Sequence, residues 1–225
     1  MLRHTLNTVL GLFVVFTAAS LTRADEAALP LILEEGFEKG ADAWQPTDAA
    51  AWKLVAGEHG QAYSLFQQSK YKPPHRSPFN FSLAKDAIVS DFTLQVRVKS
   101  TAREYDHRSM CLIFGYQDPA HFYYVHLGKK ADDHANQIFI VNDAPRIKIS
   151  TKTTPGTAWD DKWHDVKILR RVADGSIAIY FDDMSAPVMT ATDKNFLWGQ
   201  IGLGSFDDVG DYDDVKLYGL KAVRP

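Results

Sequence analysis

The stretch Phe92-Thr93-Leu94-Gln95-Val96-Arg97-Val98-Lys99 alternates apolar and polar side chains along its whole length. Successive side chains of a β-strand point to opposite faces of the sheet, so this alternation predicts a strand that is buried on one face only. The polar residues Thr93, Gln95, Arg97 and Lys99 form the outward set. Their side chains are therefore available to solvent or to a ligand.

Short segments of the same kind recur along the chain, whereas helical periodicity is weak. Turn residues separate them at Asp118-Pro119, Asp174-Gly175 and Asp182-Asp183. Many short strands at this spacing are typical of an all-β protein, and we predict a two-sheet antiparallel jelly-roll sandwich. No repeat or low-complexity linker divides residues 25–225, which are expected to form one domain. Further strands are predicted at 62–67, 110–116, 121–127, 137–141, 165–171, 176–181, 200–206 and 213–220.

A second informative stretch runs from Phe114 to Leu127 and contains two strands joined by the Asp118-Pro119 turn. In its second strand, Phe122, Tyr124 and His126 share one face, while Tyr123, Val125 and Leu127 share the other, which is predicted to be core. The first face carries a phenol and an imidazole, which suit the apolar faces and hydroxyls of a sugar ring. The alternative is that these residues only cover a solvated sheet face.

The N-terminus has the features of a secretory signal peptide. Arg3 and His4 precede an apolar run from Val9 to Leu21, and Ala24 is a small residue suited to cleavage. Residues 1–24 are predicted to be the signal peptide, so the protein is expected to be secreted or periplasmic, with no membrane span in the mature chain. An uncleaved N-terminal anchor is the alternative.

Charge and cysteine content narrow the function classes. The formal net charge of −3 and the pI of about 6.2 give no general attraction to nucleic acid, and no nucleic-acid partner is expected. Cys111 is the only cysteine, so no intramolecular disulfide forms. It lies in an apolar run and is predicted to be a buried small hydrophobic residue rather than a nucleophile.

The segment from Lys70 to Pro78 contains three prolines and cannot pair regularly in a sheet. It is predicted to be a rigid loop, and such loops often line binding sites.

Motifs at both ends of the domain form a recognisable pattern. The start has Glu35-Gly36-Phe37-Glu38-Lys39-Gly40 followed by Trp44 and Trp52, and the end has Gly202-Leu203-Gly204-Ser205-Phe206-Asp207-Asp208 and Tyr212-Asp213-Asp214-Val215. The pattern resembles the concanavalin A-like lectin/glucanase superfamily, and within it exported bacterial domains akin to the 3-keto-disaccharide hydrolase domain. The resemblance implies two curved antiparallel sheets, with ligands bound in the concave face of one of them.

The resemblance leaves the chemistry open, because one fold hosts many functions. Retaining glucanases of the superfamily carry a Glu-x-Asp-x-x-Glu strand, and this sequence contains none. Alginate-lyase-like members use Gln, His, Tyr and Arg, which are present here without the ordered motifs of that family. The expected function is recognition of a glycan or polysaccharide in a concave groove, with cleavage by a glycoside hydrolase or polysaccharide lyase mechanism as one outcome. The alternatives are a non-catalytic lectin-like or cell-envelope interaction module and a purely structural domain.

Candidate site residues follow from this expectation. If the site is catalytic, Tyr124 and His126 are the candidates for proton transfer, since they lie two positions apart on one strand. Basic and amide side chains would bind a carboxylated or sulfated glycan, because arginine presents a planar fork to such groups. If these residues do not converge, they are ordinary surface charges. The predicted substrate-binding residues are Arg76, Gln95, Arg97, Arg108, Asn142 and Arg146.

The superfamily often joins its first and last strands through a calcium ion, and the resemblance therefore implies a structural calcium site. Glu38 of the Phe37-Glu38-x-Gly40 motif and Asp213 and Asp214 of the Asp-Asp-Val motif are its expected ligands. Calcium takes oxygen ligands of this kind. The alternative is an acidic surface loop without metal.

Overall fold

The computed structural model describes residues 29–224, and the predicted signal peptide lies outside this range. Apart from a short 3-10 turn at Ala49–Ala51, the regular structure is β-strand. Within the described residues no helix is long and apolar enough to cross a membrane. The strands are β1 (Leu31–Glu35), β2 (Trp44–Pro46), β3 (Trp52–Ala56), β4 (Gln61–Leu65), β5 (Asn80–Ser100), β6 (Ser109–Asp118), β7 (His121–Gly128), β8 (Gln137–Asn142), β9 (Ile147–Lys148), β10 (Ser150–Thr153), β11 (His164–Arg170), β12 (Ser176–Phe181), β13 (Met189–Thr192), β14 (Gly199–Ser205) and β15 (Gly210–Lys221).

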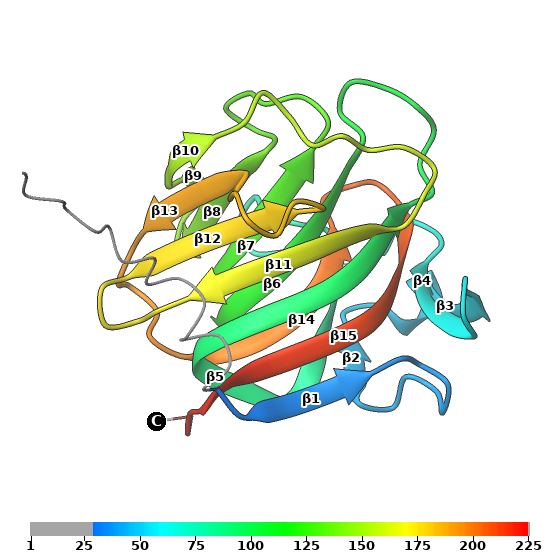
Figure 1. The fold of residues 1–225 in the computed structure, drawn as a ribbon, viewed down its shortest axis with the longest axis horizontal. Coiled ribbons are helices and arrows are strands. Elements are labelled where there is room, and N and C mark those ends of the chain that lie inside the picture. Colours follow the sequence, from blue (N-terminus) through cyan, green and yellow to red (C-terminus); the bar gives the residue numbers. More distant parts are fainter. Residues whose placement is uncertain (1–28, 225) are drawn as a thin grey trace, which may run out of the picture.

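Strand β5 spans 21 residues and belongs to both layers of the sandwich (Figure 1). Its first half pairs with β2 and with β14. Beyond β14 the sheet continues through β6, β7, β8 and β9 in that order. Its second half pairs with β15 and with β11, next to which β12, β13 and β10 follow. All of these pairs are antiparallel. We call the part of the sheet that contains β14, β6, β7 and β8 the β6–β8 layer, and the part that contains β11, β12 and β13 the β11–β13 layer.

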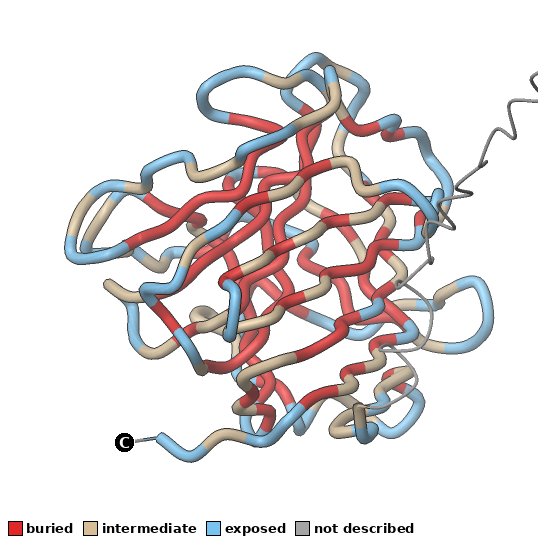
Figure 2. The backbone as a smooth tube through the Cα atoms, turned by 60° about the vertical axis from the view of Figure 1, so that its left-hand side comes forward, coloured by how far each residue is buried: buried red, intermediate tan, exposed pale blue. Residues whose placement is uncertain are grey.

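The predicted fold class is confirmed: the protein is an antiparallel all-β sandwich. Each strand predicted from alternation has a counterpart, including β7, whose Tyr123, Val125 and Leu127 lie in the core between the layers. Val166 and Ile168 of β11 face them from the opposite layer. Figure 2 shows that burial follows the strands and that the connecting loops are exposed. Cys111 is fully buried, and burial raises the pKa of its thiol, as expected for a structural residue.

The outer surface of the β6–β8 layer is also buried and unusually rich in aromatic rings. Its residues alternate along the strands with those of the central core, so they point away from it. We call this surface the aromatic face. It consists of Phe81, Leu83, Cys111, Ile113, Tyr116, Phe122, Tyr124, Phe139, Val141 and Phe206.

Residues 66–79 form an irregular segment that packs on the aromatic face, and we call it the crossing segment. At its beginning, the backbone amide of Ser69 donates to Asn80 Oδ1 over 2.6 Å. Further on, the amide of Arg146 donates to the carbonyl of Arg76 over 3.0 Å. The segment therefore runs from β5 at one side of the layer to the loop after β8 at the other. The three prolines explain why it forms no strand, as the sequence predicts.

Candidate functional site

Tyr124 and His126 lie on the aromatic face, on the same side of β7, as the alternation predicts. They are buried rather than open to solvent, because Tyr124 is 0% exposed and His126 is 6% exposed. The ring of Tyr124 stacks on Phe139, with centroids 5.1 Å apart. The imidazole of His126 stacks on Phe206, with an interplanar angle of 6°.

Arg146 joins these two residues into one group. Its Nη1 donates to the hydroxyl of Tyr124 over 2.7 Å and approaches Nδ1 of His126 at 3.5 Å. Its guanidinium lies 4.6 Å from the ring centroid of Phe139 and 4.3 Å from that of Phe206. A cation between two rings is held by the negative potential of both faces. No carboxylate of the described residues forms an ion pair with Arg146.

Both predicted proton-transfer residues have pKa values moved away from neutrality. Burial raises the pKa of Tyr124, and the positive charge of Arg146 only partly opposes this effect. Burial and then the charge of Arg146 lower the pKa of His126 to about 3. The phenol is therefore protonated and the imidazole neutral near pH 7. A histidine with so low a pKa is a weak general base at neutral pH.

The crossing segment forms a hollow of about 310 Å³ beside this group. Arg76 lies in it, and its guanidinium is 6.0 Å from the same Phe206 ring that contacts Arg146. Neither Lys72 nor Arg76 forms an ion pair with any of the described residues. No acidic residue lines the hollow. Its lining residues are Tyr71, Lys72, Pro73, Pro74, His75, Arg76 and Phe79.

Gln95 and Arg97 point outward as predicted, but from the β11–β13 layer, so they lie apart from Tyr124. Arg97 lines two hollows, of about 490 and 430 Å³. Its guanidinium is 2.5 Å from Glu58 Oε2 and 3.7 Å from Asp214 Oδ2. Because carboxylates already engage Arg97, it has less capacity for an acidic ligand than Arg76.

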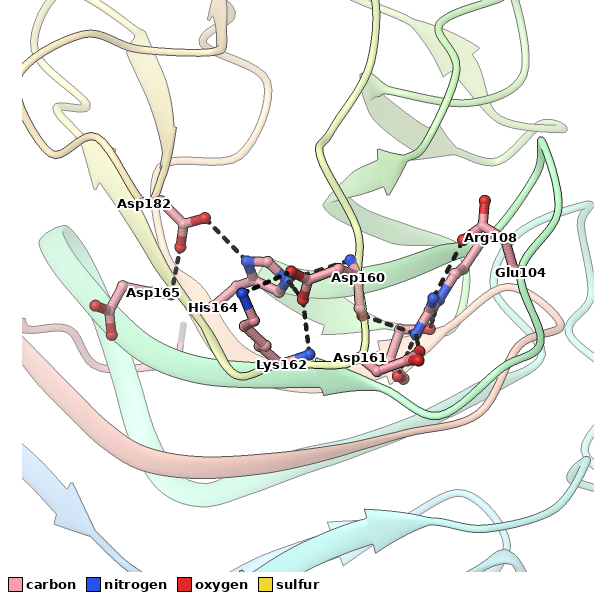
Figure 3. A network of polar contacts seen from close by, with 9 residues as sticks. Glu104, Arg108, Asp160, Asp161, Lys162, His164, Asp165 and Asp182 are labelled. Atoms are coloured by element: carbon pink, nitrogen blue, oxygen red, sulfur yellow. Dashed lines mark hydrogen bonds and ion pairs between the residues drawn. The ribbon is translucent and has the colours of Figure 1, made fainter. Parts of the chain in front are cut away.

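Arg108 is 1% exposed, and its guanidinium pairs with Glu104 and Asp161 rather than with the Tyr124 group (Figure 3). Its Nη2 donates to the carbonyl oxygens of Ser100 and Asp160 over 2.7 and 2.8 Å and to Asp161 Oδ1 over 3.0 Å. These bonds anchor the loop before β11 to the end of β5. The donors of Arg108 are thus used within the protein.

His164 continues the same network at the start of β11 (Figure 3). Its Nδ1 lies 2.9 Å from Asp182 Oδ2, and its Nε2 lies 3.2 Å from Asp160 Oδ1. Asp182 also accepts from the amide of Asp165 over 3.1 Å. The network closes one end of the β11–β13 layer, which supports a structural role for it.

Asn142 is exposed at the end of β8, in register with His121. Tyr124 pairs with Phe139 in the middle of this strand pair and His126 with Gln137 near its other end, so Asn142 is not in register with either of them. Among the predicted glycan-site residues, the structure therefore brings together Tyr124, His126, Arg146 and Arg76.

The predicted calcium ligands lie where β15 passes the first strands. Asp213 is 4% exposed, and burial first, then the charges of Asp214 and Glu38, raises its pKa. Glu38 accepts from the amide of Gln61 over 2.7 Å. The described part of the chain has no group of three or more His, Cys, Asp or Glu side chains arranged to hold a metal ion. A calcium ion here would therefore need backbone carbonyls or water beside Glu38 and Asp213.

Of the residues that line the hollow, Arg76 alone was among the predicted site residues. Lys72 and Tyr71 both lie in the proline-rich segment that the sequence already predicts to line a site. The only sequence signal that pointed to these two residues was the presence of further lysine, histidine and arginine residues in the same segment.

Comparisons with known proteins agree on the fold. No protein-family model matches the chain, and no curated protein matches it in sequence. A carbohydrate-binding module CBM66 from Bacillus subtilis has a TM-score of 0.56 at 19% identity, covering 79% of this chain and 96% of that one. Domain 4 of AbnA, an extracellular GH43 arabinanase from Geobacillus stearothermophilus, was solved with arabinotriose and has a TM-score of 0.57 at 12% identity, covering 87% and 95%.

A third solved structure has no assigned function. It is a Bacillus subtilis protein with a galectin-like fold, with a TM-score of 0.55 at 10% identity, covering 86% of this chain and 98% of that one. At these identities the similarity concerns the fold alone. The chain has the galectin-like jelly-roll fold that these domains share.

Proposed function

We propose that this protein is a non-catalytic module that binds an acidic glycan through the crossing segment and Arg146. The observation that carries the proposal is the hollow of about 310 Å³ in the crossing segment, which is lined by basic, aromatic and proline residues and by no acidic one. A hollow of this size lies within the range of ligand pockets.

The chemistry of the hollow suits a sugar that carries carboxylate or sulfate. The guanidinium of Arg76 presents a planar fork to such a group, and the ammonium of Lys72 adds a point charge. Tyr71 and the prolines offer apolar surfaces for the faces of the ring. Because neither cation is neutralised by a carboxylate of the described residues, a ligand anion meets no internal competitor.

Arg146 extends this basic surface toward Tyr124. It is half-buried, has no carboxylate partner among residues 29–224, and is fixed by Tyr124 and two aromatic rings. A guanidinium held in one position loses little conformational freedom when it binds a ligand. Arg76 and Arg146 together would contact neighbouring acidic groups.

The fold neighbours support glycan recognition. One of them is named as a carbohydrate-binding module, and another was solved in complex with arabinotriose and belongs to an extracellular enzyme. Together with the signal-peptide pattern of residues 1–24, these likenesses support export of the chain.

Binding without cleavage agrees better with the site than catalysis does. Tyr124 and His126 are buried, and their pKa values are shifted in the directions that oppose proton transfer at neutral pH. The other residues that make up the aromatic face carry no imidazole and no carboxylate.

Isothermal titration calorimetry with polygalacturonate, alginate and heparin tests the proposal. Fully methyl-esterified polygalacturonate and desulfated heparin serve as matched neutral ligands. We expect at least one acidic polymer to bind at least about tenfold more tightly than its neutral form. Neither new reducing ends nor unsaturated products should appear.

The double variant Lys72→Gln/Arg76→Gln should lose at least about tenfold in affinity for the acidic polymer. The matched control is Lys39→Gln/Arg103→Gln, which removes two exposed charges elsewhere and should bind normally. Equal binding of the neutral polymers, equal loss in the control, or no binding of any polymer would overturn the proposal.

A further inference from the structure

A second hollow, of about 350 Å³, lies at the Tyr116 end of the aromatic face. Its lining differs from that of the crossing segment, because it is rich in amide and hydroxyl groups. Its polar lining residues include Tyr116, Gln117, Gln200, Thr47, Asp118 and Arg224.

Two glutamines present fixed acceptors to this hollow. Nε2 of Gln200 donates to the carbonyls of Ala84 and Lys85 over 2.9 and 3.1 Å. Nε2 of Gln117 donates to the carbonyl of Trp198 over 3.1 Å. These bonds hold both side-chain amides, and neither side-chain Oε1 receives a hydrogen bond from the described residues, whereas the backbone carbonyl of Gln117 accepts from Arg224 over 3.4 Å. Each amide therefore keeps an oxygen that is oriented in advance and has no donor.

The hydroxyl of Tyr116 is the third unused group. Tyr116 is 9% exposed, and its ring is fixed against Phe81 and Phe122 at centroid distances of 5.8 and 5.6 Å. Its hydroxyl forms no hydrogen bond with any residue in the described range. The hydroxyl is not among the fully buried polar atoms, and Tyr116 lines the hollow, so its oxygen is available to a ligand there.

The charges around the hollow are balanced. Asp118 accepts from the amide of Ala120 over 2.7 Å and lies 2.9 Å from Nδ1 of His121. Arg224 is the opposing cation at the rim. A ligand with hydroxyl groups and no net charge matches such a lining, because hydroxyls both donate to the amide oxygens and bond to the phenol.

We infer that this hollow, with Tyr116, Gln117 and Gln200, is a binding site for a neutral sugar residue. The inference rests on the proposed function in that both place a glycan on this side of the protein, but it uses other side chains. Sugar hydroxyls donate to the oxygens of Gln117 and Gln200, and one bonds to the hydroxyl of Tyr116.

Nuclear magnetic resonance titration of the full chain tests the site, with neutral trisaccharides of glucose, mannose, galactose and arabinose as probes. At least one should shift the amide signals of Gln117 and Gln200. Tyr116→Phe keeps the ring and removes only the hydroxyl. It should lower the affinity for that trisaccharide at least about tenfold. Its melting temperature should not fall, because the hydroxyl has no internal partner. Tyr218→Phe, which removes a hydroxyl from the other layer, is the matched control.

The inference is overturned if no trisaccharide binds, or if Tyr116→Phe binds it as the unaltered chain does. The Lys72→Gln/Arg76→Gln variant separates the two proposals. This variant should still bind the neutral trisaccharide, and Tyr116→Phe should still bind the acidic polymer with unchanged affinity. Loss of both ligands in Lys72→Gln/Arg76→Gln, with neither lost in Tyr116→Phe, would place a single site at the crossing segment and remove this inference.

Discussion

Arg146 donates a hydrogen bond over 2.7 Å to the hydroxyl of Tyr124, and this contact determines what the tyrosine does. The sequence places Tyr124 among candidate catalytic residues, whereas in the structure its oxygen is an acceptor for a half-buried cation. The bond orients the guanidinium between Phe139 and Phe206. Tyr124 is therefore a positioning residue for Arg146.

Tyr124→Phe should lower the free energy of unfolding by about 1–2 kcal/mol, because it leaves a donor of Arg146 unpaired in a buried setting. Chemical denaturation measures this change. Tyr218→Phe, on the outer surface of the other layer, should leave stability unchanged. Equal stability of Tyr124→Phe and the unaltered protein would show that the hydrogen bond contributes nothing.

His126 should make the protein sensitive to mild acid. Its pKa is lowered to about 3 in the folded state, whereas an unfolded histidine has a pKa of about 6.5. Between these values the unfolded chain binds one more proton than the folded chain, so stability falls as the pH falls. The slope from this residue is about 1.4 kcal/mol per pH unit between about pH 6 and 4. In His126→Phe this part of the pH dependence should vanish from denaturation curves recorded from pH 7 to 4.

Arg108→Met should destabilise the protein by about 3 kcal/mol or more, since the carbonyls of Ser100 and Asp160 lose a buried charged donor. Glycan affinity, measured below the lowered melting temperature, should be unchanged. Arg103→Met removes an exposed arginine and serves as the control. A loss of affinity without a loss of stability would instead assign Arg108 to ligand binding.

Calcium should raise the melting temperature by several degrees if Glu38 and Asp213 hold it, because an ion that binds only the folded state stabilises that state. Thermal melts with calcium and with a chelator measure the difference. Asp213→Asn should no longer respond, and without metal it should be at least as stable, since it removes a buried charge near Glu38 and Asp214. Identical melts with calcium and chelator would exclude the site.

Alternation of side chains was sufficient to predict the strands that are buried on one side, such as residues 92–99, although Thr93 of the predicted outward set is buried at 2% exposure. The first half of β5 was missed because Phe81 and Leu83 face the aromatic face while Ala84, Ala87 and Val89 face the core. A strand that is buried on both sides shows no alternation. The period of two also placed Tyr124 and His126 correctly on one face.

The same pattern does not reveal which layer a strand joins, and this limited the prediction of the site. Gln95 and Arg97 point outward as predicted, yet from the layer opposite Tyr124. The burial of Tyr124 and His126 involves Arg146, which bonds to Tyr124, and Phe206, which stacks on His126, and both partners are distant in sequence. Such contacts follow from the three-dimensional arrangement and have no local signal in the sequence.

The crossing segment has a further consequence for the kind of glycan that fits. It runs over the aromatic face from β5 to the loop after β8, so an unbranched polymer lying flat across that face would collide with it. The hollows that stay open beside it are the one at Arg76 and the one at Tyr116. Selection would then favour chain termini and short side branches over the interior of a long polysaccharide.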